Sequence, residues 1–176
     1  MAPRAEPIPE AEYRKSIAPM LGLAPAATES TMNITRTWAL NPALMVAQRP
    51  LQDYLRNQIK VSARERELLI LRTAVLCRAE YVLAQHEKSG LRAGLSPQEV
   101  ERIAADPDSA AWSPTERLLL HVVGELLGQN TLRDDTWDAL RAVYDVGQIL
   151  DIVSLVGRYW TVSIMVNSLG VQVEQK

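Results

Sequence analysis

Five residues with chemically useful side chains fall within one stretch of the sequence. The stretch is VSARERELLILRTAVLCRAEYVLAQHEKSGLRAG, residues 61–94, and the five residues are Glu67, Cys77, Tyr81, Gln85 and His86. Histidine takes up and releases protons near neutral pH, and a carboxylate can hold one imidazole nitrogen while the other faces a substrate. These residue types indicate an acid–base pair of His86 and Glu67. Tyr81 is a candidate hydrogen-bond donor to a developing oxyanion or enolate.

Spacing alone leaves structural interpretations of this pair open. Glu67 could cap a helix or lie on the surface, and His86 could form an interhelical hydrogen bond. The residue types therefore define a candidate site, and they do not by themselves assign it a reaction.

Four further side chains are candidates for binding a substrate, namely Arg72, Cys77, Gln85 and Tyr159. Arg72 could hold a carboxylate through two hydrogen bonds, or it could pair with Glu67, Glu80 or Asp151. Cys77 could line a pocket as a lone thiol, or it could fill the core as a small apolar side chain.

The sequence carries no metal or cofactor motif. Its two histidines, His86 and His121, lie 35 residues apart, with no His-x-x-x-His motif and no cysteine cluster. It has no glycine-rich phosphate loop, no G-x-S-x-G elbow and no dinucleotide fingerprint. We interpret His121, in LLLHVVGELL, as a structural histidine, and we expect no metal and no cofactor.

The elements that position these residues are predicted to be helices. Three Ser-x-x-Glu capping boxes mark helix starts, at Ser62/Glu65, Ser96/Glu99 and Ser113/Glu116. Pro97 and Pro114 stand at the first helical position, which proline favours. The predicted helices cover residues 10–20, 29–40, 42–57, 62–78, 79–93, 97–105, 114–127, 134–144 and about 145–169, with a loop at 21–27. Pro50 is expected to kink or split its helix.

The last predicted helix is apolar on nearly every side. Its sequence ILDIVSLVGRYWTVSIMVNSLG is interrupted only by Asp151, Arg158 and Asn167. Such a helix is buried on most sides, and in a domain of this size we expect part of the burial to come from another subunit.

Composition restricts the class of protein. Of the 176 residues, 47% are apolar and 23% are charged, which is ordinary for a globular domain. A net charge of −2 gives no reason to expect nucleic acid or an anionic membrane as a partner. The single cysteine excludes an intrachain disulfide, and the sequence contains neither a signal-peptide core nor about 18 uninterrupted apolar residues. We expect a cytoplasmic protein with no membrane partner.

The segment ERELLILRTAVLCRAEYVLAQHEKSGLRAGLSPQEVERI resembles the core of the carboxymuconolactone decarboxylase and alkylhydroperoxidase D superfamily. The likeness continues through SPTERLLLHVVGELL and LDIVSLVGRYWTVSIMVNSLGV. It implies an all-α helical bundle with a central antiparallel helix hairpin. It also implies one domain, residues 29–176, after an N-terminal arm and short helix at 1–28, and assembly into homo-oligomers such as dimers, trimers or hexamers.

In the peroxidase branch of this superfamily, a Glu is followed twelve residues later by Cys-x-x-Cys-x-x-x-His. Here Glu67 and His86 match that pattern, but Ala79 and Val82 stand at the two cysteine positions. A dithiol peroxidase needs an attacking thiolate and a resolving thiol, so disulfide-cycling peroxidase activity is not expected.

The resemblance therefore implies the decarboxylase-like branch, which keeps the Glu and the His without the cysteines. It implies a cofactor-free lyase or isomerase acting on a small unsaturated or lactone carboxylic acid, with Tyr159 facing the site from its own or a neighbouring subunit. The lactone decarboxylases of protocatechuate catabolism are usually shorter, so we expect a substrate from another catabolic or biosynthetic pathway. The alternative is a non-catalytic ligand-binding or assembly protein on the same fold.

Overall fold

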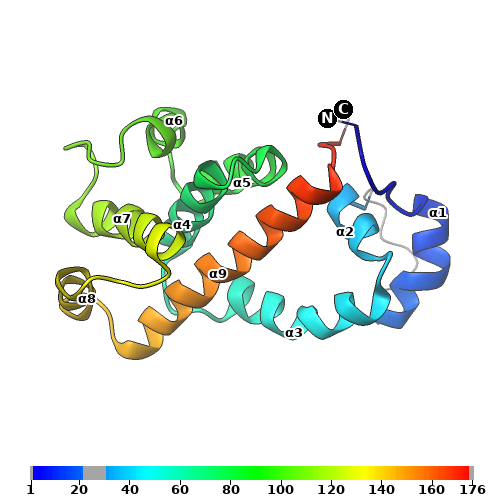
Figure 1. The fold of residues 1–176 in the computed structure, drawn as a ribbon, viewed down its shortest axis with the longest axis horizontal. Coiled ribbons are helices and arrows are strands. Elements are labelled where there is room, and N and C mark those ends of the chain that lie inside the picture. Colours follow the sequence, from blue (N-terminus) through cyan, green and yellow to red (C-terminus); the bar gives the residue numbers. More distant parts are fainter. Residues whose placement is uncertain (1, 22–30, 175–176) are drawn as a thin grey trace. The chain divides into compact units, whose positions relative to one another are not determined.

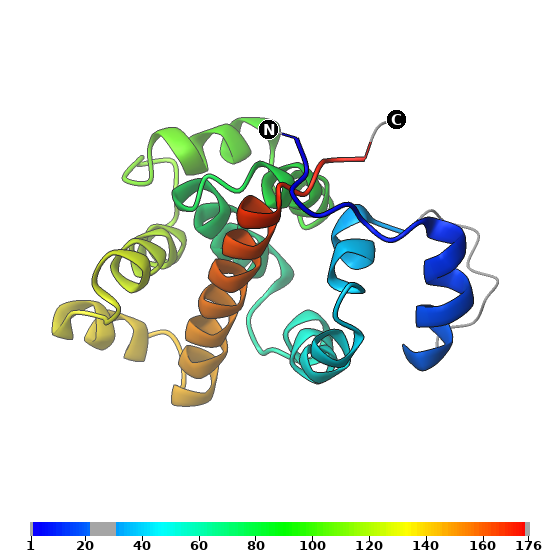
Figure 2. The ribbon, with the colours of Figure 1, turned by 45° about the vertical axis from the view of Figure 1, so that its right-hand side comes forward.

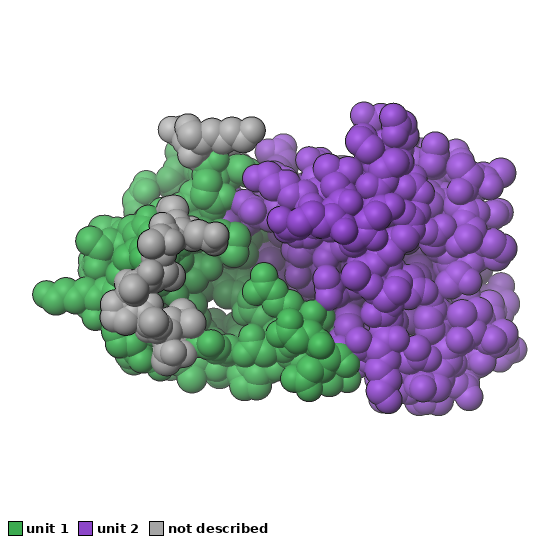
Figure 3. All heavy atoms as spheres, turned by 180° about the vertical axis from the view of Figure 1, so that it is seen from behind, with its two compact units in different colours: residues 1–58, 166–176 green, residues 59–165 purple. Residues whose placement is uncertain are grey.

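The computed structural model describes residues 2–21 and 31–174 of the chain, and every regular element in these residues is helical. The predicted all-α class is therefore confirmed (Figure 1). The predicted loop around Gly22 and Pro25, and the predicted boundary between residues 28 and 29, lie outside the described residues. The chain divides into two compact units, residues 1–58 with 166–176 and residues 59–165, which are coloured separately in Figure 3.

The second unit, residues 59–165, contains all the residues of the candidate site. Its helices are α4 (Ala63–Leu76), α5 (Glu80–Arg92), α6 (Pro97–Ala105), α7 (Pro114–Gln129), α8 (Asp134–Arg141) and most of α9 (Val146–Leu169). Helix α4 is central, because it packs against α5, α6 and α7. A core cluster of Leu68, Leu71, Leu95, Ile103, Trp112 and Leu120 fills the space between these helices.

Helices α4 and α5 form the predicted hairpin and lie side by side in Figures 1 and 2. Only residues 77–79 connect them, and Arg78 adopts the left-handed conformation, with φ of 52°. Helix α5 ends before Gly94, whose φ of 93° is a conformation that only glycine adopts without strain. The short connection brings Glu67 on α4 into contact with His86 on α5, although they lie 19 positions apart in the sequence.

The first unit contains α1 (Glu10–Glu12), a π-helical turn η1 (Tyr13–Ile17), a 3₁₀ turn η2 (Ala18–Leu21), α2 (Asn33–Trp38) and α3 (Pro42–Asn57). Residues 166–174 join it: the backbone N–H of Arg4 donates to the Leu169 carbonyl (2.8 Å), and that of Asn33 donates to Glu174 Oε1 (2.7 Å). A Cβ at Gly170, which has φ of 65°, would lie 2.8 Å from the Ala2 carbonyl oxygen. Glycine at this position therefore permits the close approach of the two chain ends.

Most helix boundaries agree with the sequence prediction, and the differences have local causes. Helix α3 continues through Pro50 without interruption. Helix α7 passes Gly128 and ends at Gln129, and the next residue, Asn130, takes the left-handed conformation with φ of 58°. After glycine, asparagine is the residue that tolerates this conformation best, so Asn130 can end the helix as Gly128 could have done.

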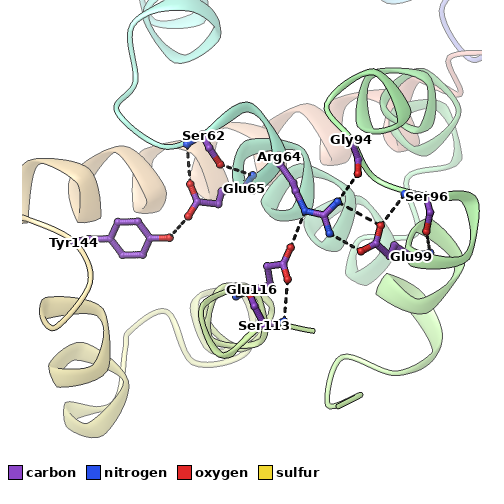
Figure 4. A network of polar contacts seen from close by, with 9 residues as sticks. All are labelled: Ser62, Arg64, Glu65, Gly94, Ser96, Glu99, Ser113, Glu116 and Tyr144. Carbon is purple, nitrogen blue, oxygen red and sulfur yellow. Dashed lines mark hydrogen bonds and ion pairs between the residues drawn. The ribbon is translucent and has the colours of Figure 1, made fainter. Parts of the chain in front are cut away.

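The three capping boxes form as predicted at the starts of α4, α6 and α7. The side chain of Arg64, at the start of α4, binds the other two boxes (Figure 4). Its Nε donates to Glu116 Oε1 (2.7 Å), and its Nη2 donates to Glu99 Oε1 (2.5 Å). Its Nη1 donates to the Gly94 carbonyl (2.5 Å), and the hydroxyl of Tyr144 donates to Glu65 of the first box (2.5 Å). One arginine thus joins the N-termini of three helices.

We expect this network to make the chain acid-sensitive. Hydrogen bonds from Arg64, together with the cap bonds of Ser96, lower the pKa of Glu99 to about 2. A carboxyl with a lowered folded-state pKa contributes stability above its ordinary value of 4.5, and the contribution is lost as pH falls from there toward about 2. Urea unfolding at about pH 5 and about pH 3 should therefore show a lower midpoint at the lower pH. If the Glu99→Gln variant lost as much stability over this interval as the wild-type chain, the assignment to Glu99 would be wrong.

Helix α9 is the one helix in the described part of the chain that is long and apolar enough to cross a membrane. Half of its most apolar window is buried within the chain. Near its start, Asp151 accepts a hydrogen bond from the Lys60 backbone N–H (3.1 Å), and the Gln148 side chain donates to the Lys60 carbonyl (3.0 Å). These contacts are typical of a helix that packs within a helical domain.

Candidate functional site

The centre of the candidate site is a hydrogen bond between α4 and α5. His86 Nδ1 lies 2.7 Å from Glu67 Oε2. The residue Glu67 is 2% exposed, and the side chain of His86 is 20% exposed. An ionised carboxylate can only accept, so with Glu67 ionised Nδ1 donates in this bond, and Nε2 is then the nitrogen that can exchange a proton with another molecule. The geometry is that of an imidazole oriented by a buried acid.

Arg66 holds the second oxygen of the same carboxylate. Its Nε and Nη2 each lie 3.3 Å from Glu67 Oε1. Glu67 is therefore held by a guanidinium on one oxygen and by the imidazole on the other. Sequence analysis missed Arg66, because adjacent residues on a helix point about 100° apart and no spacing rule pairs them.

Helix α9 supplies the third part of the site. The ring of Tyr159 meets the imidazole of His86 edge to face, with centroids 5.0 Å apart and an interplanar angle of 90°. Arg158, the residue before Tyr159, is half-buried. Burial lowers the pKa of the Arg158 guanidinium, and its interaction with Tyr159 partly opposes this shift. Arg158 was also not predicted as a site residue, although it is the only cation in the apolar run 149–170.

The other predicted site residues are spread over the two hairpin helices. On α5, Tyr81 is 4% exposed and Gln85 is half-buried. Cys77 lies just after the end of α4, ten residues and therefore about 15 Å along the helix axis from Glu67. Arg72 lies on another side of α4, and its Nη1 donates to the Ile103 carbonyl (2.8 Å) at α6. Glu67, His86 and Tyr159 are thus in direct contact in the structure, whereas Arg72 is hydrogen-bonded to α6.

The remaining histidine is on the surface. His121 Nε2 lies 2.6 Å from Asp108 Oδ1, and the two side chains are 48% and 70% exposed. The positions matching the peroxidase cysteines are buried, with Ala79 0% and Val82 3% exposed. Within residues 2–21 and 31–174, no three His, Cys, Asp or Glu side chains are grouped closely enough to hold a metal ion.

Cys77 is expected to react slowly with thiol reagents. Burial raises the pKa of the Cys77 thiol, and a hydrogen bond with Ser163 offsets only part of this shift. Because the thiolate is the reactive form, labelling by a disulfide reagent at neutral pH should be slower in the folded chain than in urea, and it should accelerate only above the usual thiol range. Equal labelling rates for the folded and unfolded chains would contradict this prediction.

The fold of this chain is shared with several solved structures. The structure is similar to the alkylhydroperoxidase AhpD core of an uncharacterised peroxidase-related protein from Ralstonia eutropha JMP134, with a TM-score of 0.80, 18% identity, and coverage of 99% of this chain and 95% of that one. It is also similar to a putative antioxidant defence protein AhpD from Agrobacterium tumefaciens, with a TM-score of 0.71, 21% identity, and coverage of 79% and 96%. These likenesses show the alkylhydroperoxidase D-type fold.

A third similar structure is the debrominase Bmp8, as a Cys-to-Ala variant in complex with 2,3,4-tribromopyrrole, with a TM-score of 0.76, 15% identity, and coverage of 99% of this chain and 93% of that one. No curated protein matches the sequence. The model of the Carboxymuconolactone decarboxylase family matches residues 42–125, a region that includes both Glu67 and His86. The predicted resemblance to the carboxymuconolactone decarboxylase and alkylhydroperoxidase D superfamily is confirmed.

Proposed function

We propose that this chain is a cofactor-free acid–base enzyme that decarboxylates or isomerises a small unsaturated or lactone carboxylic acid. The observation that carries the proposal is the 2.7 Å contact between Nδ1 of His86 and Oε2 of the buried Glu67. Arg66 and Tyr159 also contact this pair, and a cluster of ionisable groups in an apolar setting is typical of an active site.

In the decarboxylation, the bond between the carboxylate carbon and the adjacent carbon breaks and CO₂ leaves. The electron pair of that bond stays on the conjugated carbons as an enolate or dienolate. Protonated His86 then gives its Nε2 proton to the carbanionic carbon, and a proton from water restores the imidazolium. Glu67 stabilises the imidazolium before the transfer and fixes the ring orientation. In an isomerisation, Nε2 would remove a proton from one carbon and return it to another.

Two observations support this reaction class over a dithiol peroxidase. Ala79 and Val82 provide no thiol beside His86 in sequence, and burial raises the pKa of Cys77 away from the thiolate form. The ring-shaped ligand of debrominase Bmp8 supports a small cyclic molecule as a ligand on this fold. The lone cysteine is compatible with our proposal that the protein works in the reducing cytoplasm.

A second candidate function, assembly without catalysis, is favoured by the outer side of α9. Five large apolar side chains on this helix are each at least 37% exposed and follow one another at helical spacing, namely Val146, Leu150, Val153, Trp160 and Ile164. Exposed apolar rows of this kind are typical of contact surfaces between copies. We propose a homo-oligomer, and sedimentation analysis that found only monomer would contradict it.

The experiment that tests the enzymatic proposal is a screen of small lactone and enol carboxylic acids by mass spectrometry and ultraviolet absorbance. The wild-type chain should release CO₂ from, or isomerise, at least one of these acids, and the His86→Ala variant should not. His121→Ala is the matched control, because His121 lies on the surface and should leave turnover unchanged. Equal turnover by His86→Ala would remove His86 from the mechanism. Binding without turnover would favour the non-catalytic candidate.

A further inference from the structure

The carboxyl group of Glu67 lies in the most buried part of α4. The residue is 2% exposed, and the four residues that follow it are exposed by no more than 1%, namely Leu68, Leu69, Ile70 and Leu71. A buried carboxylate without a counter-charge takes up a proton, because the neutral acid loses less hydration free energy on burial than the anion does. Whether Glu67 is ionised therefore depends on the groups that it contacts.

Two residues form hydrogen bonds or ion pairs with this carboxyl group in the part of the chain that the structure describes. Oε2 meets Nδ1 of His86 at 2.7 Å, and Oε1 meets Nε and Nη2 of Arg66 at 3.3 Å each. A neutral imidazole brings no charge to this contact, whereas a guanidinium is never deprotonated in a protein. Arg66 is therefore the partner that can keep Glu67 ionised while His86 is neutral.

The ionisation of Glu67 decides which nitrogen of neutral His86 carries the proton. An ionised carboxylate accepts from Nδ1–H and leaves a lone pair on Nε2, whereas a protonated carboxyl donates to Nδ1 and leaves the proton on Nε2. The 2.7 Å distance fits both arrangements. Within the described residues, the other group that faces the ring is Tyr159 of α9, next to Arg158 in the chain, and it meets the ring edge to face. The tautomer of His86 is thus selected by Glu67.

We propose that Arg66 is a positioning residue that acts through Glu67. Its guanidinium keeps Glu67 ionised, and the ionised carboxylate holds the proton of neutral His86 on Nδ1, so that Nε2 presents a lone pair to the substrate. Because Arg66 offsets the charge of Glu67, the imidazolium also releases its Nε2 proton more readily than it would beside Glu67 alone. The protonation states are properties of the protein alone, and their use in turnover rests on the proposed function.

The chain allows a direct test because it contains only two histidines. Long-range ¹H–¹⁵N correlation spectra of the ¹⁵N-histidine-labelled protein, recorded over a pH titration, show which ring nitrogen carries a proton. We expect neutral His86 to carry it on Nδ1. His121, whose Nε2 lies 2.6 Å from Asp108 Oδ1, should carry it on Nε2, and its signals are identified with a His121→Gln variant. A proton on Nε2 of neutral His86 in the wild-type chain would overturn the inference without any variant.

Variants assign the effect to the charge of Arg66. Arg66→Gln carries no charge but can still donate to Glu67, and in this variant Nε2 of His86 should keep its proton to a pH about one unit or more higher than in the wild type. Arg66→Lys should recover most of the difference, because it restores the charge without the planar fork. Arg92→Gln is the matched control, since Arg92 is exposed on α5 and bonds to Ser89. An unchanged titration of Nε2 in Arg66→Gln would overturn the inference.

The spectra and the turnover screen can fail separately. A titration of His86 that depends on Arg66, with no acid turned over, would retain the role of Arg66 and remove the enzymatic proposal. Turnover that depends on His86, with a titration that does not depend on Arg66, would retain the acid–base function and remove the inference. Unmoved His121 signals and an unchanged circular-dichroism spectrum show that a variant is folded, and the wild-type tautomer remains a test if Arg66→Gln does not fold.

Discussion

The Glu67→Gln variant should turn over the substrate at least about a hundredfold more slowly than the wild-type chain. Glutamine has nearly the same shape as glutamate and can still meet Nδ1 of His86, which lies 2.7 Å from the carboxylate. It carries no charge, so it cannot stabilise an imidazolium, and its amide can also hold the ring in the wrong tautomer. The loss should appear in kcat, measured on the acid that the screen identifies, with the circular-dichroism spectrum unchanged.

Two comparisons make this prediction specific. Glu87→Gln removes an exposed carboxylate next to His86 in the sequence, and it should retain wild-type turnover. The double variant Glu67→Gln/His86→Ala should be no slower than His86→Ala alone, because the two residues act as one unit. A Glu67→Gln variant with wild-type kcat would mean that the buried carboxylate has only a structural role.

The Arg64→Ala variant should lower the free energy of unfolding by about 2–3 kcal/mol. The guanidinium of Arg64 joins Glu99 of α6 and Glu116 of α7 to α4, and its removal leaves these two carboxylates without their shared cation. Burial alone would raise the pKa of Glu116, but hydrogen bonds from Ser113 and Arg64 lower it, so this carboxylate depends on the arginine too. Urea unfolding followed by circular dichroism measures the change.

Arg92→Ala provides the matched control for this effect, because it removes an exposed arginine of the same unit that bonds only to Ser89. Arg92→Ala should lower the free energy of unfolding by no more than about 0.5 kcal/mol. In a chain that already carries Glu99→Gln and Glu116→Gln, Arg64→Ala should lower the free energy of unfolding much less than it does in the wild-type chain, since the three side chains form one network. An unchanged cost in that background would show that Arg64 stabilises the chain through other contacts.

The helical architecture was predictable because its signals are local in the sequence. Each capping box needs only a Ser and a Glu three residues later, and all three form where predicted. The end of α7 was missed because Gly128 and Asn130 are both residues that can end a helix, and the local sequence does not distinguish between them. The tertiary role of Glu99 and Glu116 as partners of Arg64 could not be derived, since it depends on where three helices meet.

The candidate site could be predicted only in part. Glu67 and His86 were proposed from residue type and family resemblance, and the structure brings them into contact across the hairpin. Arg66 and Arg158 were missed because a charged residue on a helix gives no sequence signal for which neighbour it meets. Arg158 did interrupt an apolar run, and that exception is the one clue that sequence analysis could have used.

In the proposed mechanism, His86 transfers a proton to or from carbon under the control of Glu67. The measurement that tests it most directly is turnover of the identified acid in D₂O, with deuterium located in the product by NMR and mass spectrometry. We expect the wild-type chain to place one deuterium on the carbon that His86 protonates, and we expect His86→Ala to form no product. Deuterated product formed by His86→Ala at the wild-type rate would show that His86 does not transfer the proton.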